Sequence, residues 1–262
     1  VVLIKSEENT KGRIRKQARI RIRNENEHYI LSEDDNIFSP YALNFFNDAF
    51  HIYEDDPNVF SICAYLPPGL KISHGRTLSL PYPEGWGIGL WKKKGDFLDW
   101  NYTQLAKEFL RSKRAVELAN RLKPDLVPLT IACAEERLVA GDVAACNYTL
   151  LNDLQCIYPS NTLVINRGYD GSGKNCGISS FFQNQIYLKV PIVVKKGQEI
   201  TLDSEEMDKF VKVVYPNESI LYNNILIRRY FAGKNSFGKL LTNLILLLLK
   251  CLRYMKRIIV KI

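Results

Sequence analysis

Residues 29–36 read Tyr-Ile-Leu-Ser-Glu-Asp-Asp-Asn, an apolar run that leads directly into three adjacent carboxylates. This pattern is typical of a buried strand that ends at the polar edge of a sheet. Adjacent carboxylates repel one another unless a cation lies between them or one of them is protonated. Mg²⁺ and Mn²⁺ prefer oxygen ligands and leave positions open for substrate phosphates. We therefore predict a metal–diphosphate site at Glu33–Asp35; the alternative is an acidic turn before a helix that Ser39 caps, with Pro40 at its first position.

A second acidic triplet, Glu-Asp-Asp at residues 54–56, provides an internal comparison. It follows a stripe of apolar residues at helical spacing between Leu43 and Tyr53, and Pro57 comes directly after it. Both features are typical of the end of a helix at the protein surface. We predict a helix-ending turn there and assign it no chemistry.

The 262 residues carry a formal net charge of +8, and this charge is unevenly spread. Nine Lys or Arg and no Asp or Glu follow Glu218, so the preceding residues are nearly neutral. This asymmetry favours an anionic surface that one end of the chain contacts, and it argues against a nucleic-acid-binding body. The six cysteines show neither C-x-x-C pairs nor zinc-ligand spacing, and no secretory signal is present. We therefore expect reduced thiols in a cytoplasmic protein.

The region from Val59 to Trp91 contains a strand and a stretch rich in glycine and tryptophan. Residues 59–65 form a near-continuous apolar run, which predicts a strand buried on both faces. Residues 81–91 read Pro-Tyr-Pro-Glu-Gly-Trp-Gly-Ile-Gly-Leu-Trp. Glycines permit close approach to a flat partner while indoles supply stacking faces, which suits the apolar face of a sugar ring. The alternative is a structural tryptophan packed on a glycine bend.

The second half of the chain predicts helices over 103–122 and 130–151, followed by a strand at 163–165. A carboxylate on a partly buried helix, such as Asp142, is a candidate general base; the alternative is surface charge. Residues 166–176 form a glycine-containing loop whose amides could close over a phosphate, although its spacing is not that of a P-loop. Residues 186–215 read as two or three β segments.

From about Phe237 the tail reads as one helix. Its apolar run, Leu244–Leu249, is shorter than the ~20 residues that span a bilayer. Basic residues from Lys239 to Lys261 fall near one stripe at helical spacing, opposite a Leu/Ile face. This pattern favours a helix that lies in an anionic membrane interface. The alternative is a helix docked on the protein's own core or on a partner.

Several of these motifs, taken in order, resemble those of bacterial family-2-like glycosyltransferases of the GT-A fold, which act in surface-polysaccharide assembly. The resemblance covers roughly residues 1–180. It depends on the acidic run 32–36, Phe45-Phe46 with Tyr53, the strand 59–65, the stretch 86–91, Tyr158-Pro159 and the glycine loop 166–173. It departs from the family in two places: the strands and helix that usually precede this start are absent, and Asn175 stands where relatives often have histidine.

The resemblance implies roles for individual residues. Asp35, helped by Asp34 or Glu33, would hold Mg²⁺ or Mn²⁺ on the diphosphate of a nucleotide-sugar donor. Asp142 matches the position of the catalytic carboxylate. The remaining implied contacts are with the acceptor, through Trp86, Gly87 and Trp91, and with the donor, through Glu33, Asp34, Gly171 and Gly173.

The expected fold is therefore α/β and GT-A-like (Rossmann-like), with a mixed, mostly parallel sheet and flanking helices. Because Val1 starts inside an apolar run, we expect the first strands to be missing. We expect a partial catalytic domain at 1–185, a β/helical extension at 186–236 and a basic amphipathic membrane-associating helix at 237–262.

The expected activity is inverting, metal-dependent sugar transfer to a saccharide or lipid-linked acceptor, on the inner face of the cell membrane. The alternative is a non-catalytic membrane-peripheral interaction protein or an inactive remnant of such an enzyme.

Overall fold

The computed structural model describes residues 13–70, 75–94, 100–171, 178–187, 189–216, 219–232, 243–245 and 247–248. The chain forms two compact units that interleave along the sequence. The first comprises residues 1–100 and 152–203, and the second comprises residues 101–151 and 204–262. The predicted boundaries at residues 185 and 236 divide the chain by expected function and not by compactness, and they stay a prediction. Most of the predicted tail helix, 237–262, lies outside the described residues.

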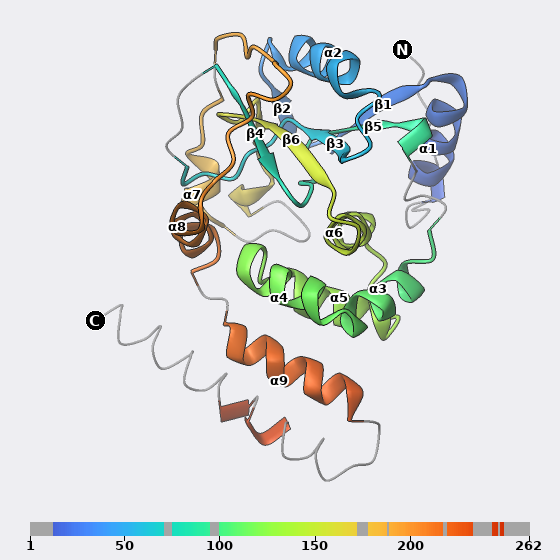
Figure 1. Ribbon diagram of the computed structural model, residues 1–262, viewed down its shortest axis with the longest axis vertical. Coiled ribbons are helices and arrows are strands. Elements are labelled where there is room, and N and C mark those ends of the chain that lie inside the picture. Colours follow the sequence, from blue (N-terminus) through green and yellow to red (C-terminus); the bar gives the residue numbers. More distant parts are fainter. Residues whose placement is uncertain are drawn as a thin grey trace. The chain divides into compact units, whose positions relative to one another are not determined.

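The first unit contains a five-stranded sheet in the order β1-β5-β3-β6-β4 (Figure 1). Its strands are β1 His28–Leu31, β3 Val59–Cys63, β4 Thr77–Leu80, β5 Ile88–Trp91 and β6 Gln155–Pro159. In the described sheet, β3 and β6 are parallel, whereas the pairs β1–β5, β3–β5 and β4–β6 are antiparallel.

The fold is thus mixed α/β with flanking helices, but the prediction of a mostly parallel sheet is wrong. Every residue of β3 is buried, as the apolar run predicts. Such a run reports burial on both faces of a strand and not the direction of its neighbours. Here β3 lies between the parallel β6 and the antiparallel β5.

A small second sheet joins two segments that are distant in the sequence. β2, Asn36–Phe38, pairs antiparallel with β7, Val164–Asn166. In this register Asn36 lies opposite Asn166. The acidic residues 33–35 therefore lie in the turn between β1 and β2, next to the segment that follows β7.

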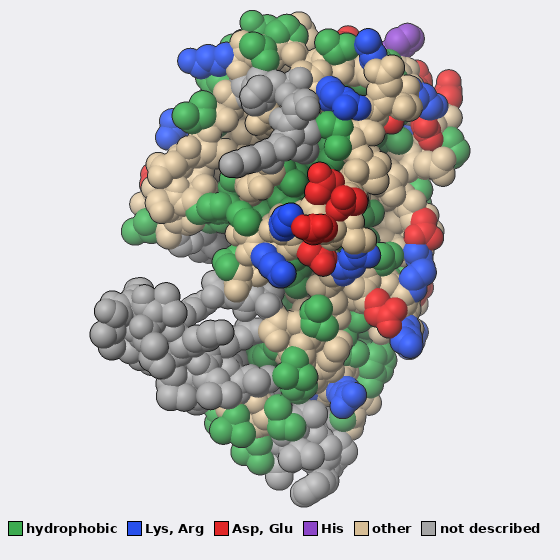
Figure 2. Space-filling view, turned by 60° about the vertical axis from the view of Figure 1, so that its left-hand side comes forward, with side chains coloured by type: hydrophobic (Ala, Val, Ile, Leu, Met, Phe, Trp, Pro, Cys, Tyr) green, Lys and Arg blue, Asp and Glu red, His purple; other side chains and the backbone are tan. Residues whose placement is uncertain are grey.

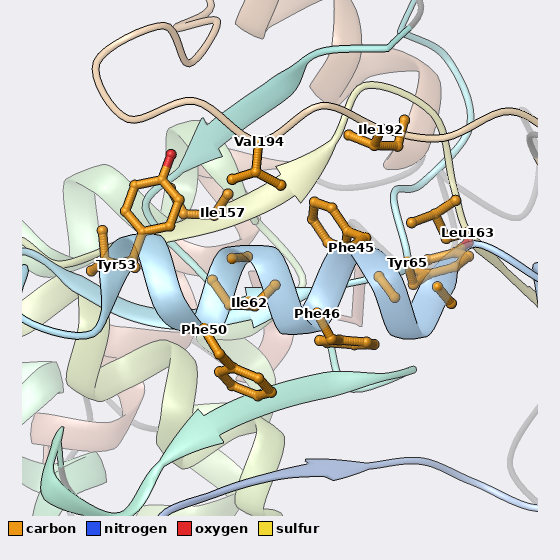
Figure 3. Packing of buried hydrophobic residues seen from close by; sticks show 14 of the residues in the cluster. Phe45, Phe46, Phe50, Tyr53, Ile62, Tyr65, Ile157, Leu163, Ile192 and Val194 are labelled. Carbon is orange, nitrogen blue, oxygen red and sulfur yellow. The ribbon is translucent and has the colours of Figure 1, made fainter.

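Helix α2, Ala42–Tyr53, packs its aromatic stripe into the core of the first unit. Figure 3 shows Phe46 and Phe50 on one side of this helix, and Phe45 and Tyr53 on the other side, toward Val194. A Cβ atom at position 89 would lie 2.7 Å from the Phe50 ring and 2.9 Å from the Phe46 ring. The glycine at position 89 of β5 is therefore explained by the close approach of these rings to the strand backbone.

The start of helix α2 differs from its predicted position, whereas its end agrees with the prediction. The helix begins at Ala42, two residues after the predicted Pro40, and Ser39 contributes its backbone oxygen to the Ala42 amide at 3.0 Å. At the other end the prediction is confirmed: residues 54–56 form a surface turn just after Tyr53. There the Lys94 ammonium donates to the backbone oxygens of Tyr53, Asp56 and Val59, and so satisfies carbonyls at the end of the helix.

The second unit is helical. Its helices are α3 Tyr102–Arg111, α4 Lys113–Leu122, α5 Leu126–Ala134, α6 Gly141–Leu151, α8 Ser204–Val214 and α9 Ile220–Phe231. The first unit contributes the helical segments α1 Arg13–Glu25, η1 Lys92–Lys94, η3 Gly168–Asp170 and α7 Ser180–Gln183. None of the described helices has the length and hydropathy needed to cross a bilayer.

Each long helix predicted over 103–122 and 130–151 is in fact two helices. Ser112 ends α3 and also caps α4, because its hydroxyl accepts the Ala115 N–H at 3.2 Å. Between α5 and α6 the chain turns at Glu136, whose φ of 58° lies in the left-handed region. The β segments predicted over 186–215 are also wrong in the described residues, where α8 occupies Ser204–Val214 and a single bridge joins Leu78 to Ile200.

The packing of α2 yields a stability prediction. Replacing Phe46 by alanine removes a fully buried ring next to Gly89, so we expect a loss of about 3–5 kcal/mol in the free energy of unfolding. Leu43 lies on the same helix but is 64% exposed, and Leu43→Ala should change stability by less than about 0.5 kcal/mol. Urea denaturation of both variants measures the difference. Equal losses would show that the aromatic stripe does not hold the first unit together.

Candidate functional site

The carboxylate of Asp35 is held in place by a buried asparagine. Asn166, which is 3% exposed, donates from Nδ2 to Asp35 Oδ1 at 2.8 Å and to Asn36 Oδ1 at 3.0 Å. The backbone oxygen of Asp35 accepts the Arg167 N–H at 2.9 Å. These contacts cross the β2–β7 pair, so one rotamer of Asp35 is selected by residues more than a hundred positions away.

Gly168 completes this arrangement. Its N–H donates to Asn166 Oδ1 at 2.8 Å, and a Cβ atom at this position would lie 2.3 Å from Asp35 Oδ2. No side chain fits there unless Asp35 moves. In the described part of the chain no group donates a hydrogen bond to Asp35 Oδ2. This oxygen is therefore available to a ligand while its partner Oδ1 is anchored.

The other two carboxylates of the predicted site are less confined. Glu33 and Asp34 are both exposed, and the turn is closed by an Asn36 N–H to Glu33 oxygen bond of 3.3 Å. Among the described residues there is no group of three or more His, Cys, Asp or Glu side chains that could hold a metal ion. The arrangement instead offers one oriented carboxylate, Asp35, with Asp34 beside it. Magnesium is commonly bound by one or two carboxylates together with substrate phosphates, so these residues fit that mode.

The two acidic triplets differ in their cationic partners. In the second triplet, Lys93 Nζ lies 3.2 Å from Glu54 and 2.8 Å from Asp55, and Lys196 Nζ lies 3.0 Å from Asp56. The hydrogen bond from Lys93 lowers the pKa of Asp55 below its ordinary value. In the first triplet, neither Asp34 nor Asp35 forms an ion pair with a described Lys or Arg. Among the described residues, Asp34 and Asp35 therefore have no cationic side chain beside them.

Trp86 lies in a cluster of aromatic side chains that includes Tyr169, the residue after Gly168. Its ring centroid is 4.5 Å from that of Tyr65, 5.6 Å from that of Tyr169 and 6.4 Å from that of Phe182. Tyr169 and Phe182 stack at 4.5 Å. Trp86 remains half-buried, so part of its indole faces solvent. Tyr169 thus connects the aromatic cluster to the Asn166–Gly168 segment that holds Asp35.

The neighbouring residues of the predicted acceptor site have structural roles. Gly87 adopts a φ of +82°, and a Cβ atom there would lie 3.0 Å from the Phe38 ring. Trp91 is 2% exposed, and its indole N–H donates to the Phe50 oxygen at 3.2 Å. The indole of Trp91 belongs to the core and presents no face to an acceptor. Of the two tryptophans predicted to contact the acceptor, Trp86 is partly exposed, and it lies near the Asn166–Gly168 segment that holds Asp35.

The glycine loop is described only at its start. Gly171 ends η3 with a φ of +95°, in the left-handed region that glycine adopts without strain. Its predicted contact with a donor is not tested by this geometry. Gly173, the second donor residue predicted in this loop, lies outside the described residues.

Asp142 belongs to the second unit, where it is exposed in the first turn of α6. A carboxylate at this position stabilises the helix by interacting with the positive end of its dipole. That contribution accounts for an acidic residue here without chemistry, and the catalytic role of Asp142 stays a prediction. Glu135, also exposed, pairs with Arg137 and fits the surface-charge alternative.

A separate pocket of about 180 Å³ lies elsewhere in the first unit. It is lined by Gly75, Arg76, Thr77, Val193, Lys195 and Gln198, and none of these belongs to the acidic turn. The residue that sequence reasoning missed is Asn166. Its position directly after an apolar strand was visible, but an uncharged amide gives no sign in the sequence that it orients a distant carboxylate.

The bonds of Asn166 yield a second stability prediction. Asn166→Ala leaves the buried Gly168 N–H without its acceptor, so we expect a loss of about 1–3 kcal/mol in the free energy of unfolding. Asn47→Ala is the control, because Asn47 is exposed on α2 and alanine favours a helix. Chemical denaturation compares the two. An Asn166→Ala protein as stable as Asn47→Ala would contradict the network.

Comparison with known proteins finds no family model and no curated protein that matches this chain. The resemblance noted in the sequence motifs is therefore not tested by those comparisons. The geometry around Asp35 and the motifs themselves indicate the function.

Proposed function

We propose that this protein is a metal-dependent glycosyltransferase that moves a sugar from a nucleotide-sugar donor to a saccharide or lipid-linked acceptor. Bacterial surface-polysaccharide synthesis is the process that the motif resemblance favours. The observation that carries the proposal is the contact between Asn166 and Asp35, which joins two motifs of the resemblance across 131 residues of sequence. Independent motifs that meet at one carboxylate are expected for a site and not for a random acidic turn.

The charges of Asp34 and Asp35 support a cationic ligand. The triplet at 54–56 has lysine partners, whereas Asp34 and Asp35 have no described cation beside them. In the proposed site Asp35 Oδ2 and the Asp34 carboxylate would hold Mg²⁺ or Mn²⁺. The ion would neutralise the charge that develops on the departing diphosphate. Asn166 keeps Asp35 oriented, and Gly168 leaves room for it.

The half-exposed indole of Trp86 is the proposed acceptor platform. Its position is set by three rings, Tyr65, Tyr169 and Phe182, so it is rigid before a ligand arrives. A rigid aromatic face binds the apolar side of a sugar at little cost in conformational entropy. In the proposed reaction Asp142 removes the proton from the acceptor hydroxyl, which attacks the donor sugar directly and inverts its configuration.

A non-catalytic protein is the second candidate, and one observation favours it. Asp142, the predicted base, is exposed in the first turn of α6, where the helix dipole accounts for a carboxylate without chemistry. An inactive remnant of a transferase, or a membrane-peripheral interaction protein, would retain the fold without binding a donor. Calorimetry with UDP- and GDP-sugars in the presence of Mn²⁺ separates the candidates, because only the transferase releases or absorbs heat on mixing.

The location we propose is the cytoplasmic face of the cell membrane, where donor sugars and lipid-linked acceptors meet. The basic tail, residues 237–262, is the segment proposed to contact the lipid. A liposome co-sedimentation experiment with and without this segment tests the assignment.

Substitution of Asp35 tests the metal site. In the full chain, Asp35→Asn should lower sugar transfer by on the order of 10²-fold and abolish the Mn²⁺ dependence of donor binding, because a neutral amide is a poor ligand for a hard cation. Asp55→Asn makes the same chemical change in the triplet that has lysine partners, and it should leave both measurements unchanged. Radiolabelled sugar transfer and calorimetry provide the readouts. Equal behaviour of the two variants would remove the metal assignment.

Substitution of Asp142 tests the base separately. Asp142→Asn should slow transfer by about 10²–10⁴-fold while donor affinity stays unchanged, because a general base acts on the acceptor and not on the donor. Glu117→Gln, an exposed change on α4, is the control. If the rate falls together with donor binding, or does not fall at all, Asp142 only stabilises the N-terminus of α6.

A further inference from the structure

Helix α9 exposes a face that combines large apolar side chains with arginines. Ile220, Leu221 and Phe231 are 55%, 59% and 53% exposed, and Arg228 and Arg229 are exposed as well. At about 100° per residue, Ile220, Phe231, Arg228 and Leu221 lie within about 100° of one another, and Arg229 lies about 80° beyond Leu221. An exposed apolar stripe with basic residues beside it is characteristic of a surface that meets something else.

The orientation of this face is fixed by Asn223, which lies about 60° from Ile220 and about 160° from Leu221 around the helix axis. Asn223 is fully buried in the second unit, and its Nδ2 donates to Asn120 Oδ1 and to the Pro124 oxygen, both at 2.8 Å. The Ser219 hydroxyl accepts the Tyr222 N–H at 3.3 Å and caps the helix. Because these contacts anchor α9 against α4 and the start of α5, rotation that would bury Leu221 or Phe231 is opposed. The exposed face is thus a fixed feature of the folded unit.

Charge identifies the partner. From residue 219 to the end, the sequence holds nine Lys or Arg and no Asp or Glu. Figure 2 shows hydrophobic and basic side chains, and no acidic ones, in its lowest described part, while Glu135 at the end of α5 acts electrostatically on Tyr230 of α9. A second copy of the chain would bring the same cations together at a symmetric contact, which is unfavourable. A surface of lipid phosphates complements the arginines and accepts the apolar side chains between its headgroups.

We propose that the exposed face of α9, with Leu221 and Phe231 inserted and Arg228 and Arg229 against lipid phosphates, docks the folded second unit on an anionic membrane. The tail was assigned to the membrane from sequence alone, whereas this surface belongs to the folded helical unit. Leu244, Leu247 and Leu248 are also exposed in the described part of the tail, so both segments offer apolar side chains. The inference does not depend on sugar transfer, since a non-catalytic protein would dock in the same way.

The test is vesicle flotation of the full chain with the tail present in every variant. Wild type should bind vesicles of phosphatidylcholine with phosphatidylglycerol, should bind phosphatidylcholine alone far less, and should be released by salt. Leu221→Gln with Phe231→Gln should weaken binding at least about tenfold, because two apolar side chains no longer leave water. Arg228→Gln with Arg229→Gln should weaken it about 25-fold, since each basic residue near an anionic surface contributes about a fivefold factor.

Val213→Gln is the matched control, because Val213 is 44% exposed on α8, whose first turn carries Glu205 and Glu206. It should bind as wild type does. Circular dichroism and thermal melting check that each variant is folded. The arginine variant keeps the test decisive if the apolar variant is destabilised, because it alters only exposed side-chain ends.

Three results would overturn the proposal: folded α9 variants that bind as wild type does, equal binding of wild type to neutral and anionic vesicles, or a change in oligomeric state by light scattering with vesicle binding intact. The last would assign the face to contact between copies. A failure of sugar transfer with normal flotation would count against the proposed activity and leave this inference standing.

Discussion

The geometry of the candidate site depends on the hydrogen bonds made by the side-chain amide of Asn166. Its nitrogen donates to Asp35 and Asn36, and its oxygen accepts the N–H of Gly168. A buried amide whose nitrogen and oxygen are both hydrogen-bonded in this way is rigid, because each bond constrains the others. The small β2–β7 sheet brings the partners within reach, and Tyr169, the next residue after Gly168, extends the constraint to the ring of Trp86.

The chain contains two identical Glu-Asp-Asp triplets, and their surroundings differ. Residues 54–56 follow a helix whose last carbonyl, that of Tyr53, accepts a hydrogen bond from Lys94, and Lys93 and Lys196 compensate their charge. Residues 33–35 lie between two strands, and Asp35 is bound by Asn166. The chemistry of a carboxylate group is therefore decided here by its neighbours in space, and composition is a poor guide to it.

The sequence allowed the strands near 29–31, 59–65 and 163–165, the aromatic stripe of α2 and the surface turn at 54–56 to be predicted, because burial periodicity and helix-end signals are local. The strands β2, β4, β5 and β6 were not predicted. The direction of neighbouring strands was not predictable, since an apolar run such as Val59–Cys63 is compatible with either. The helix breaks at Ser112 and Glu136 were missed, because neither glycine nor proline marks them. The contact of Asn166 with Asp35 was missed because no local pattern encodes a pairing across so many residues.

The interleaving of the two units has a consequence for biosynthesis. The chain passes from one unit to the other after residues 100, 151 and 203. Strand β3 thus leaves the ribosome long before β6, its parallel neighbour, and the helices α3 to α6 are made in the interval. During that interval one edge of a strand that is fully buried in the finished fold has no partner, and such an edge invites pairing with other chains. The helical segment has local contacts and can fold early. The free edge of β3 is covered only when the ribosome delivers residues 155–159.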